Sequence, residues 1–336
     1  MATPKIDSTI PQVWLVGGGV ASMAAAAFLI RDADVPGHHI HILEELGLQG
    51  CALDGAKLPV QSGYVTRGGR MLEEEAYQTA WNLMETIPSL ENPHISVRQE
   101  CLDFNERVKT EAHARLIDGD HNIIDASVYG FDSRDRLELM RLLATPEHTL
   151  GARRIEELFS AHFFTTNFWQ MWRTTFAFQN WHSAIELERY FIRFIQEFSR
   201  IHTLSGVRRT KYNQYDSLIR PLQRWMIERG VDVRFSTRAT RLHLRTKVGE
   251  TSIELGVNDV TMITLGSITA DSTYAGNDSV TELIRDRRDD GWSLWESIAR
   301  KAPDFGRPNT FYRNHGHDAV CVGLVQPTTS GRPARY

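Results

Sequence analysis

Length, composition and charge restrict the kinds of protein that this chain can be. Its 336 residues carry 42 acidic and 38 basic side chains, a formal net charge of −4 at pH 7, which argues against a nucleic-acid protein. No uncharged apolar run approaches the length of a membrane span, so we expect at most peripheral contact with a membrane. The three cysteines have no C-x-x-C spacing and suit a reducing compartment, so we expect a cytoplasmic protein without a metal site.

Residues 13–44 have the order of elements that is typical of a dinucleotide-binding βαβ unit. The short apolar run Val13–Val16 predicts a buried parallel strand, and a glycine-rich turn and an alanine-rich helix follow it. Gly17 and Gly19 allow the backbone to turn tightly and approach a pyrophosphate, whose charge then faces the helix N-terminus. We interpret Gly18 as a permissive loop residue. The unit predicts a flavin or nicotinamide protein, and a purely structural glycine turn is the alternative.

Two further positions refine this prediction. A second apolar run, Ile40–Leu43, ends in Glu44, where a carboxylate can accept hydrogen bonds from a ribose diol and favours an unphosphorylated ribose over NADP. Ser22 replaces the third glycine of the G-x-G-x-x-G pattern and is small enough to keep the helix close to the strand. Both residues are therefore predicted to lie at the cofactor.

The next part of the chain alternates between loops and helices. Glycine-rich residues 50–54 and 63–70 predict loops and short strands that would lie over a bound nucleotide. Apolar spacing predicts helices over 72–84 and 133–143, and the stretch 95–125 between them predicts strand and loop.

The C-terminal half contains a further helix and two strand candidates. A helix over 216–229 is closed by Gly230, and alternation then predicts a strand over 231–245. Residues 260–265 predict a buried strand that returns beside the first one and ends in Gly266-Ser267, close to the cofactor. Beyond it, Ser293 and Glu296 have the spacing of a capping box, which predicts a helix that runs to Lys301 and is stopped by Pro303.

Residues 159–198 are unusually rich in aromatic side chains. An i, i+3, i+4, i+7 stripe predicts an amphipathic helix with a wide buried face, formed by Leu187, Tyr190, Phe191, Phe194, Ile195 and Phe198. By residue type alone, core packing is the favoured interpretation. A lipid tunnel would use the same residues, because an acyl chain is bound mainly by burial of its methylene groups.

Several short blocks together indicate a family. They are Gly17–Ser22, Ile40–Glu45, Arg67-Gly68-Gly69-Arg70, Ile87–Leu90, Phe176-Ala177-Phe178, Trp181–Ala184, Thr210–Tyr215 and Gly266–Thr269. In these blocks and in their order the chain resembles the oleate hydratases, also called the myosin-cross-reactive antigen family. The resemblance extends from about residue 13 to residue 313.

The resemblance implies a fold related to the amine oxidases. We expect an α/β fold with an FAD-binding Rossmann-type (amine-oxidase-like) domain and an inserted mixed α/β and helical substrate domain. On this basis residues 12–110 and 205–313 form the discontinuous FAD-binding domain, and residues 111–204 form the largely helical, aromatic-rich substrate region.

The resemblance also implies an FAD-dependent lyase, a hydratase of unsaturated fatty acids such as oleate and linoleate. Water is added across the cis-9 double bond to give a 10-hydroxy fatty acid, with no net redox chemistry at the flavin. Such a reaction needs a proton donor at one carbon, a positioned water at the other, and stabilisation of the positive charge that develops between them. A phenol and a carboxylate can divide these tasks.

The proton donor implied by the resemblance is Tyr190, which follows the Trp181–Ala184 block and lies on the apolar stripe. A phenol at this position suits a pocket lined by apolar groups. Without the resemblance, we would interpret Tyr190 as a buried tyrosine whose hydroxyl group bonds to a backbone carbonyl group.

The glutamate that activates water in the family usually follows Arg-Gly-Gly-Arg directly, but this chain has Met71 there. Methionine can neither accept a proton nor hold a water firmly. Glu73, Glu74 and Glu75 lie just beyond, so Glu73 or Glu74 could take over this role, as could a flavin-bound water. Their alternative role is favourable charge near a helix N-terminus, which we expect for at least two of the three.

Arginines of the glycine-rich block resemble family residues near the flavin. We therefore predict that the cofactor is bound by Arg67, Gly68, Gly69, Arg70 and Ser267. The alternative for the two arginines is that they are solvated surface residues. A lysine or arginine near Thr210–Tyr215 could pair with the carboxylate group of the fatty acid.

The end of the chain departs from the family pattern. Residues 314–336 lose the resemblance and become rich in proline, glycine and arginine, so we expect a divergent, disordered tail on a truncated chain. Two other functions stay open from the sequence: an amine-oxidase-like flavin oxidoreductase, and a non-catalytic remnant that binds flavin or lipid.

Overall fold

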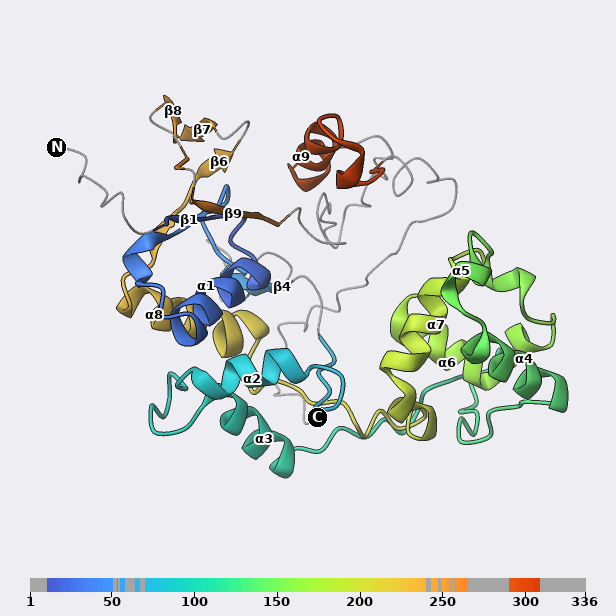
Figure 1. Ribbon diagram of the computed structural model, residues 1–336. Coiled ribbons are helices and arrows are strands. Elements are labelled where there is room, and N and C mark those ends of the chain that lie inside the picture. The colour runs from blue at the N-terminus through green and yellow to red at the C-terminus, as the bar shows by residue number, and fades with distance from the viewer. Residues whose placement is uncertain are drawn as a thin grey trace, which may run out of the picture. The chain divides into compact units, whose positions relative to one another are not determined.

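The structure is a computed structural model that describes residues 11–50, 53, 55–57, 64–66, 70–239, 243–246, 249–253, 255–256, 258–264 and 290–308 (Figure 1). The chain divides into two compact units. The first, here the sheet unit, comprises Met1–Arg70, Ile87–His94 and Tyr212–Tyr336, and the second, here the helical unit, comprises Met71–Thr86 and Ile95–Lys211.

A four-stranded parallel sheet forms the centre of the sheet unit. Its strand order is β5-β2-β1-β9, with β1 at Val13–Val16, β2 at Ile40–Leu43, β5 at Asp232–Arg234 and β9 at Val260–Ile263. Val16 aligns with Leu43 on one side and with Ile263 on the other, so the strand ends meet at one edge. Helix α1, Val20–Asp32, connects β1 to β2 and contacts α8, Arg220–Glu228 (Figure 1).

Shorter elements complete the described part of the sheet unit. They are the 3₁₀ turns Gly37–His39 and Pro303–Phe305, the antiparallel strands β3 (Gly55–Lys57) and β4 (Tyr64–Thr66), the antiparallel strands β6 (Thr237–Ala239), β7 (His243–Thr246) and β8 (Gly249–Ser252), a π-helical turn at Tyr215–Ile219, and helix α9 (Asp290–Ala299).

The helical unit is built around an aromatic core. Its helices are α2 (Gln78–Thr86), α3 (Val97–Arg107), α4 (Ser133–Ala144), α5 (Glu147–Leu150), α6 (Asn167–Phe176) and α7 (Ala184–Arg193), with 3₁₀ turns at Ile155–Glu157, Phe163–Thr165 and Ile195–Ser199. Phe163, Phe168, Trp169, Trp172 and Phe191 are fully buried in one cluster. Most of the aromatic segment is thus core, as its residue types indicated.

Several predicted elements are confirmed. Strands β1 and β2 have the predicted bounds, β9 lies beside β1, and α4 begins at Ser133 as expected. Gly230, with φ +87°, follows the end of α8.

Other predictions were wrong, and tertiary contacts explain most of them. The stretch predicted as strand and loop contains helix α3, which buries Val97, Cys101 and Asn105. Strand β9 is half-exposed rather than buried. The predicted strand over 231–245 is divided into β5, β6 and β7, and α9 begins before Ser293, so Ser293 is not its N-cap.

The division into units follows different boundaries from those expected. Residues 71–86 and 95–110 group with the helical unit rather than with the sheet unit. Helices α2 and α3 pack against each other, and the Asn105 side chain holds the backbone of Arg209: its amide donates to the carbonyl group at 2.8 Å and its Oδ1 accepts from the N–H at 2.9 Å. The predicted tail, 314–336, lies outside the described residues.

Candidate functional site

The turn between β1 and α1 requires glycine at its first position. Gly17 has φ +94°, and a Cβ atom there would lie 2.2 Å from Thr264 Oγ1. The Thr264 hydroxyl group is held in place because it donates to the carbonyl oxygen of Val16 at 2.8 Å. The end of β9 therefore closes against this turn, as the prediction for the returning strand indicated.

Gly18 is also tightly constrained, so its interpretation as a permissive loop residue was wrong. Its N–H donates to Glu44 Oε2 at 2.6 Å, and a Cβ atom on it would lie 2.6 Å from that oxygen. Glu44 Oε1 accepts a second bond from the Leu46 N–H at 2.7 Å. Burial raises the pKa of the Glu44 carboxyl group, and these backbone donors oppose the rise. Glu44 thus fixes the glycine turn, while each oxygen retains lone-pair capacity for a ribose hydroxyl group.

Helix α1 has features that favour an anion at its N-terminus. Gly19 is the N-cap without a side-chain hydrogen bond, and the first turn contains no acidic residue. Ser22 is buried at the strand end, with its hydroxyl group 3.4 Å from Thr264 Oγ1. Such close packing is expected when a small residue occupies the third glycine position of the G-x-G-x-x-G pattern.

A buried glutamine beside the glycine turn fits a polar ligand. The Gly50 N–H donates to the carbonyl oxygen of Gly18 at 3.0 Å, and the preceding Gln49 is fully buried. Neither polar atom of the Gln49 side chain has a hydrogen-bond partner within the described residues. A buried amide without partners is costly, so a cofactor that bonded to it would relieve that cost. The residues present therefore fit a dinucleotide such as FAD.

Part of the predicted cofactor site cannot be compared with the structure. Arg67, Gly68, Gly69 and Ser267 lie outside the described residues, and Arg70 is half-buried at the end of the sheet unit.

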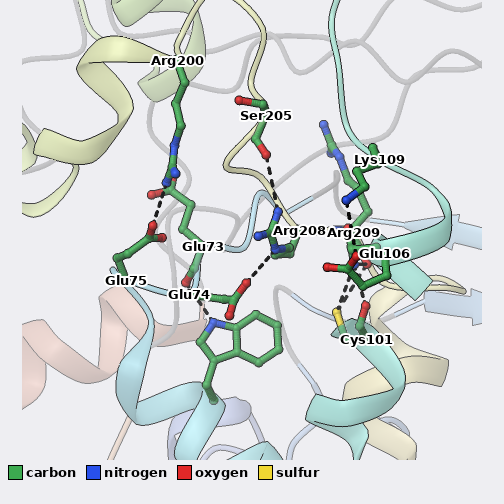
Figure 2. A network of polar contacts seen from close by, with 12 residues as sticks. Glu73, Glu74, Glu75, Cys101, Glu106, Lys109, Arg200, Ser205, Arg208 and Arg209 are labelled. Atoms are coloured by element: carbon green, nitrogen blue, oxygen red, sulfur yellow. Dashed lines mark hydrogen bonds and ion pairs between the residues drawn. The ribbon is translucent and has the colours of Figure 1, made fainter. Parts of the chain in front are cut away.

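A second group of predicted residues lies in the helical unit, where a β-bridge precedes three glutamates (Figure 2). The Leu72 backbone is paired with that of Arg208, through N–H donation in both directions at 3.2 and 2.6 Å. The Trp81 indole N–H then donates to the carbonyl oxygen of Glu73 at 2.9 Å. These bonds hold residues 72–75 outside helix α2, which was predicted to begin at residue 72 and begins at Gln78.

Glu73 is the most deeply buried of these three glutamates. Its side chain is 3 % exposed, and its Oε2 accepts a hydrogen bond from the Gln196 amide at 2.9 Å. Burial first, and the charge of Glu197 second, raise the pKa of Glu73 to about 7. A carboxyl group with this pKa can accept or release a proton near neutral pH.

The two neighbouring glutamates form ion pairs with arginines. Glu74 Oε1 lies 2.8 Å from Arg208 Nε, and Glu75 Oε1 lies 3.1 Å from an Nη atom of Arg200 (Figure 2). Met71, half-buried, directly precedes the bridge. Arg200 and Arg208 are thus anchored to the segment that contains Glu73.

Tyr190 lies at the rim of the aromatic core. Its ring makes edge contacts with Phe176 and Phe178, at interplanar angles of 76° and 89°. Those two rings flank Ala177, which ends α6 in the left-handed conformation with φ 59° and ψ 35°. Burial is the main reason that the pKa of Tyr190 is raised, so the phenol keeps its proton. Tyr190 remains half-buried, and its hydroxyl group has no hydrogen-bond partner in the part of the chain that is described.

Packing connects Tyr190 with the segment of Glu73. The Tyr77 N–H donates to the carbonyl oxygen of Glu73 at 3.2 Å, and the Tyr77 ring lies 6.2 Å from that of Phe194. Phe194 in turn lies 5.6 Å from the Tyr190 ring. The two predicted catalytic groups therefore belong to one packed unit.

Gln49, Gln196 and Glu197 were not identified from the sequence. Their importance depends on burial and on partners far away in the chain, and no local pattern marks them. The only available signal was that Gln196 and Glu197 lie within the amphipathic stripe, between Ile195 and Phe198.

The parallel sheet and the glycine turn define the sheet unit as a Rossmann-type α/β unit. The profile of the MCRA family matches residues 11–325. The chain belongs to the MCRA family, as the sequence blocks indicated.

Two curated relatives are similar over most of this chain. It is 36 % identical over 329 residues to the oleate hydratase of Streptococcus pyogenes serotype M49 (strain NZ131), covering 93 % of this chain and 55 % of that protein. It is 32 % identical over 336 residues to the linoleate hydratase of Lactiplantibacillus plantarum, covering 89 % of this chain and 59 % of that protein. The chain thus spans little more than half the length of these relatives.

Solved structures show weaker similarity. A Pyrococcus furiosus protein has a TM-score of 0.46 at 15 % identity, covering 76 % of this chain and 59 % of its own. The fatty acid isomerase of P. acnes that produces CLA has a TM-score of 0.35 at 15 % identity, covering 73 % and 57 %. Family membership therefore rests on the sequence matches. Among the described residues, no helix is both long and apolar enough to span a membrane.

Proposed function

We propose that this protein binds FAD and hydrates the cis-9 double bond of an unsaturated fatty acid such as oleate or linoleate, giving a 10-hydroxy fatty acid. Membership of the MCRA family, with its named hydratase relatives, supports the reaction class. The observation that carries the proposal in this chain is the buried Glu73 carboxyl group, with a pKa of about 7, in the same unit as Tyr190.

The residues proposed to hold FAD are those of the glycine turn. Gly17, Gly18 and Gly19 would allow the backbone to approach the pyrophosphate, and the N-terminus of α1 would supply a favourable field for its charge. Glu44 would accept hydrogen bonds from the ribose, and the Gln49 amide would find its missing partners. When bound, FAD undergoes no net oxidation or reduction, as the family resemblance implies.

Glu73 and Tyr190 are proposed to divide the proton transfers. The Glu73 carboxylate accepts a proton from water while the water oxygen forms a bond to one alkene carbon. The other alkene carbon takes the phenolic proton of Tyr190, and the π electron pair becomes the new C–H bond. The proton on Glu73 then returns through solvent to the Tyr190 phenolate, so the net change is the addition of one water molecule. Glu73 thereby takes the role that Met71 cannot perform.

The test is incubation of the FAD-loaded protein with oleate in ¹⁸O-labelled water, followed by mass spectrometry. We expect a product heavier by one labelled water. Because general acid and base catalysis each contribute roughly 10²–10⁴-fold, Tyr190→Phe and Glu73→Gln should each lower the rate by at least about 100-fold. Glu85→Gln, which changes an exposed glutamate on α2, is the matched control for Glu73→Gln.

A protein that shows the flavin absorption band but adds no water to oleate or linoleate would contradict the proposal. Peroxide release without hydration would instead favour the flavin oxidoreductase. Full activity of Glu73→Gln would assign the base to another group.

A further inference from the structure

A second buried carboxyl group lies beside Glu73. Glu197 is 2 % exposed, and its Oε1 accepts a hydrogen bond from Arg200 Nε at 2.5 Å. Its Oε2 is buried without a hydrogen-bond partner among the described residues. The preceding residue, Gln196, donates to Glu73, and the charge of Glu197 acts on Glu73 directly. Glu73 and Glu197 are thus two buried carboxyl groups that influence each other and have little access to water.

The chain covers the Glu197–Arg200 ion pair closely. A Cβ atom on Gly206 would lie 2.3 Å from Glu197 Oε1 and 2.2 Å from Arg200 Nε. A larger residue at this position would therefore require the ends of the Glu197 and Arg200 side chains to move. The backbone of Gly206 thus lies close to the carboxyl end of Glu197 and contributes to the burial of that group.

Two ionised carboxylates at such a site would repel each other strongly, and the unpartnered Oε2 would add the cost of a buried charge. The charged groups that face Glu73 are Glu197 and Arg200 from the segment 195–204 and Glu75 from its own turn. Arg200 is shared between Glu197 and Glu75, so its single positive charge cannot neutralise all three carboxylates.

We propose that Glu197 is a positioning residue for Glu73: it is buried on the segment whose Gln196 amide bonds to Glu73, and it keeps the Glu73 carboxyl group protonated when exposed glutamates are ionised. This inference rests on the proposed function for its role in catalysis: the pair makes Glu73 basic enough to take a proton from water near neutral pH. An exposed glutamate would be a far weaker base. Gln196 acts in the opposite direction, since its amide stabilises the Glu73 carboxylate.

The test uses two variants with opposite expected effects and does not require substrate. Carboxyl carbon NMR of glutamate-labelled protein follows the titration of Glu73, which Glu73→Gln assigns. In Glu197→Gln the like charge is lost, so the Glu73 midpoint should fall by about one pH unit. In Gln196→Leu the stabilising donor is lost, so the midpoint should rise. Glu85→Gln, an exposed position on α2, is the matched control and should leave it unchanged.

The pH profile of hydration gives the second measurement. The limb on which the rate rises with pH should move with the NMR midpoint, to lower pH in Glu197→Gln and to higher pH in Gln196→Leu. An unchanged Glu73 midpoint in folded Glu197→Gln overturns the inference. If Glu197→Gln does not fold, an unchanged or lower midpoint in Gln196→Leu overturns it.

The two proposals can fail separately. Opposite shifts of the NMR midpoint in a protein that hydrates no fatty acid would support the carboxyl pair and reject the hydratase function. Hydration by a protein whose Glu73 midpoint does not respond to Glu197→Gln would support the hydratase function and reject the role of Glu197.

Discussion

Glu73 is placed where its ionised form is unfavourable to the fold. Its pKa is raised from 4.5 to about 7, so the folded state prefers the protonated carboxyl group. The associated stability is fully present below pH 4.5 and is lost as the pH rises through about 7. Burial of Glu73 near Glu197 thus lowers stability above neutral pH, which favours a functional reason for this arrangement.

This gives a prediction for Glu73→Gln, whose side chain cannot ionise. Its free energy of unfolding at pH 8 should exceed that of the parent protein by up to about 3 kcal/mol, with little gain at pH 4.5. Urea denaturation at the two pH values measures this. Exposed Glu85→Gln is the control. An equal gain in stability for Glu73→Gln at both pH values would contradict the assignment.

The turn between β1 and α1 shows how local backbone geometry shapes the proposed cofactor site. Gly17→Ala would force an alanine into a positive-φ conformation and against Thr264, so we expect loss of stability by about 1–3 kcal/mol and loss of flavin binding. Flavin absorbance after FAD reconstitution and a thermal melt measure the two effects. Gly47→Ala is the control, because an added Cβ atom there meets nothing within 4 Å. Undiminished flavin content in Gly17→Ala would contradict the role of the turn.

Elements with strong local signals could be predicted from the sequence. The apolar runs of β1 and β2 and the periodicity of α4 identify these elements without tertiary information. Helix α3 gives no such signal, because its buried face contains only Val97, Cys101 and Asn105 and the last of these is polar. The late start of α2 is set by Arg208, more than a hundred residues away, which no local pattern can reveal.

The residues of the candidate site likewise divide into those that local sequence patterns predict and those that depend on tertiary contacts. Gly17, Ser22 and Glu44 follow from a spacing rule, and Glu73 follows from its nearness to the position of the missing family glutamate. Which of the adjacent glutamates would be buried depends on contacts with Gln196 and Arg200. Glu197 could not be predicted, since its importance comes only from its location beside Glu73.

At the scale of the whole molecule, the proposed cofactor turn belongs to the sheet unit, and the proposed proton-transfer groups belong to the helical unit. FAD at about 100 times its Kd should stabilise the residues that bind it by about 2.7 kcal/mol. Hydrogen exchange should therefore slow in peptides that contain β1, the start of α1 and β2. Peptides of the aromatic core, residues 163–176, should change much less.

Buffer and riboflavin provide the controls for this experiment, because riboflavin lacks the pyrophosphate and the adenosine. Equal slowing in both sets of peptides would show that the chain responds to FAD as one cooperative body, contrary to the expectation.

The left-handed turn at Ala177 affects how the chain could be stabilised. Glycine there would relieve about 1–2 kcal/mol of steric cost, so a screen for heat resistance would select it. The same change would loosen the joint between Phe176 and Phe178, the rings that orient the Tyr190 phenol. Selection for melting temperature alone would thus give a more stable protein in which the phenol of Tyr190, the proposed proton donor, is held less firmly.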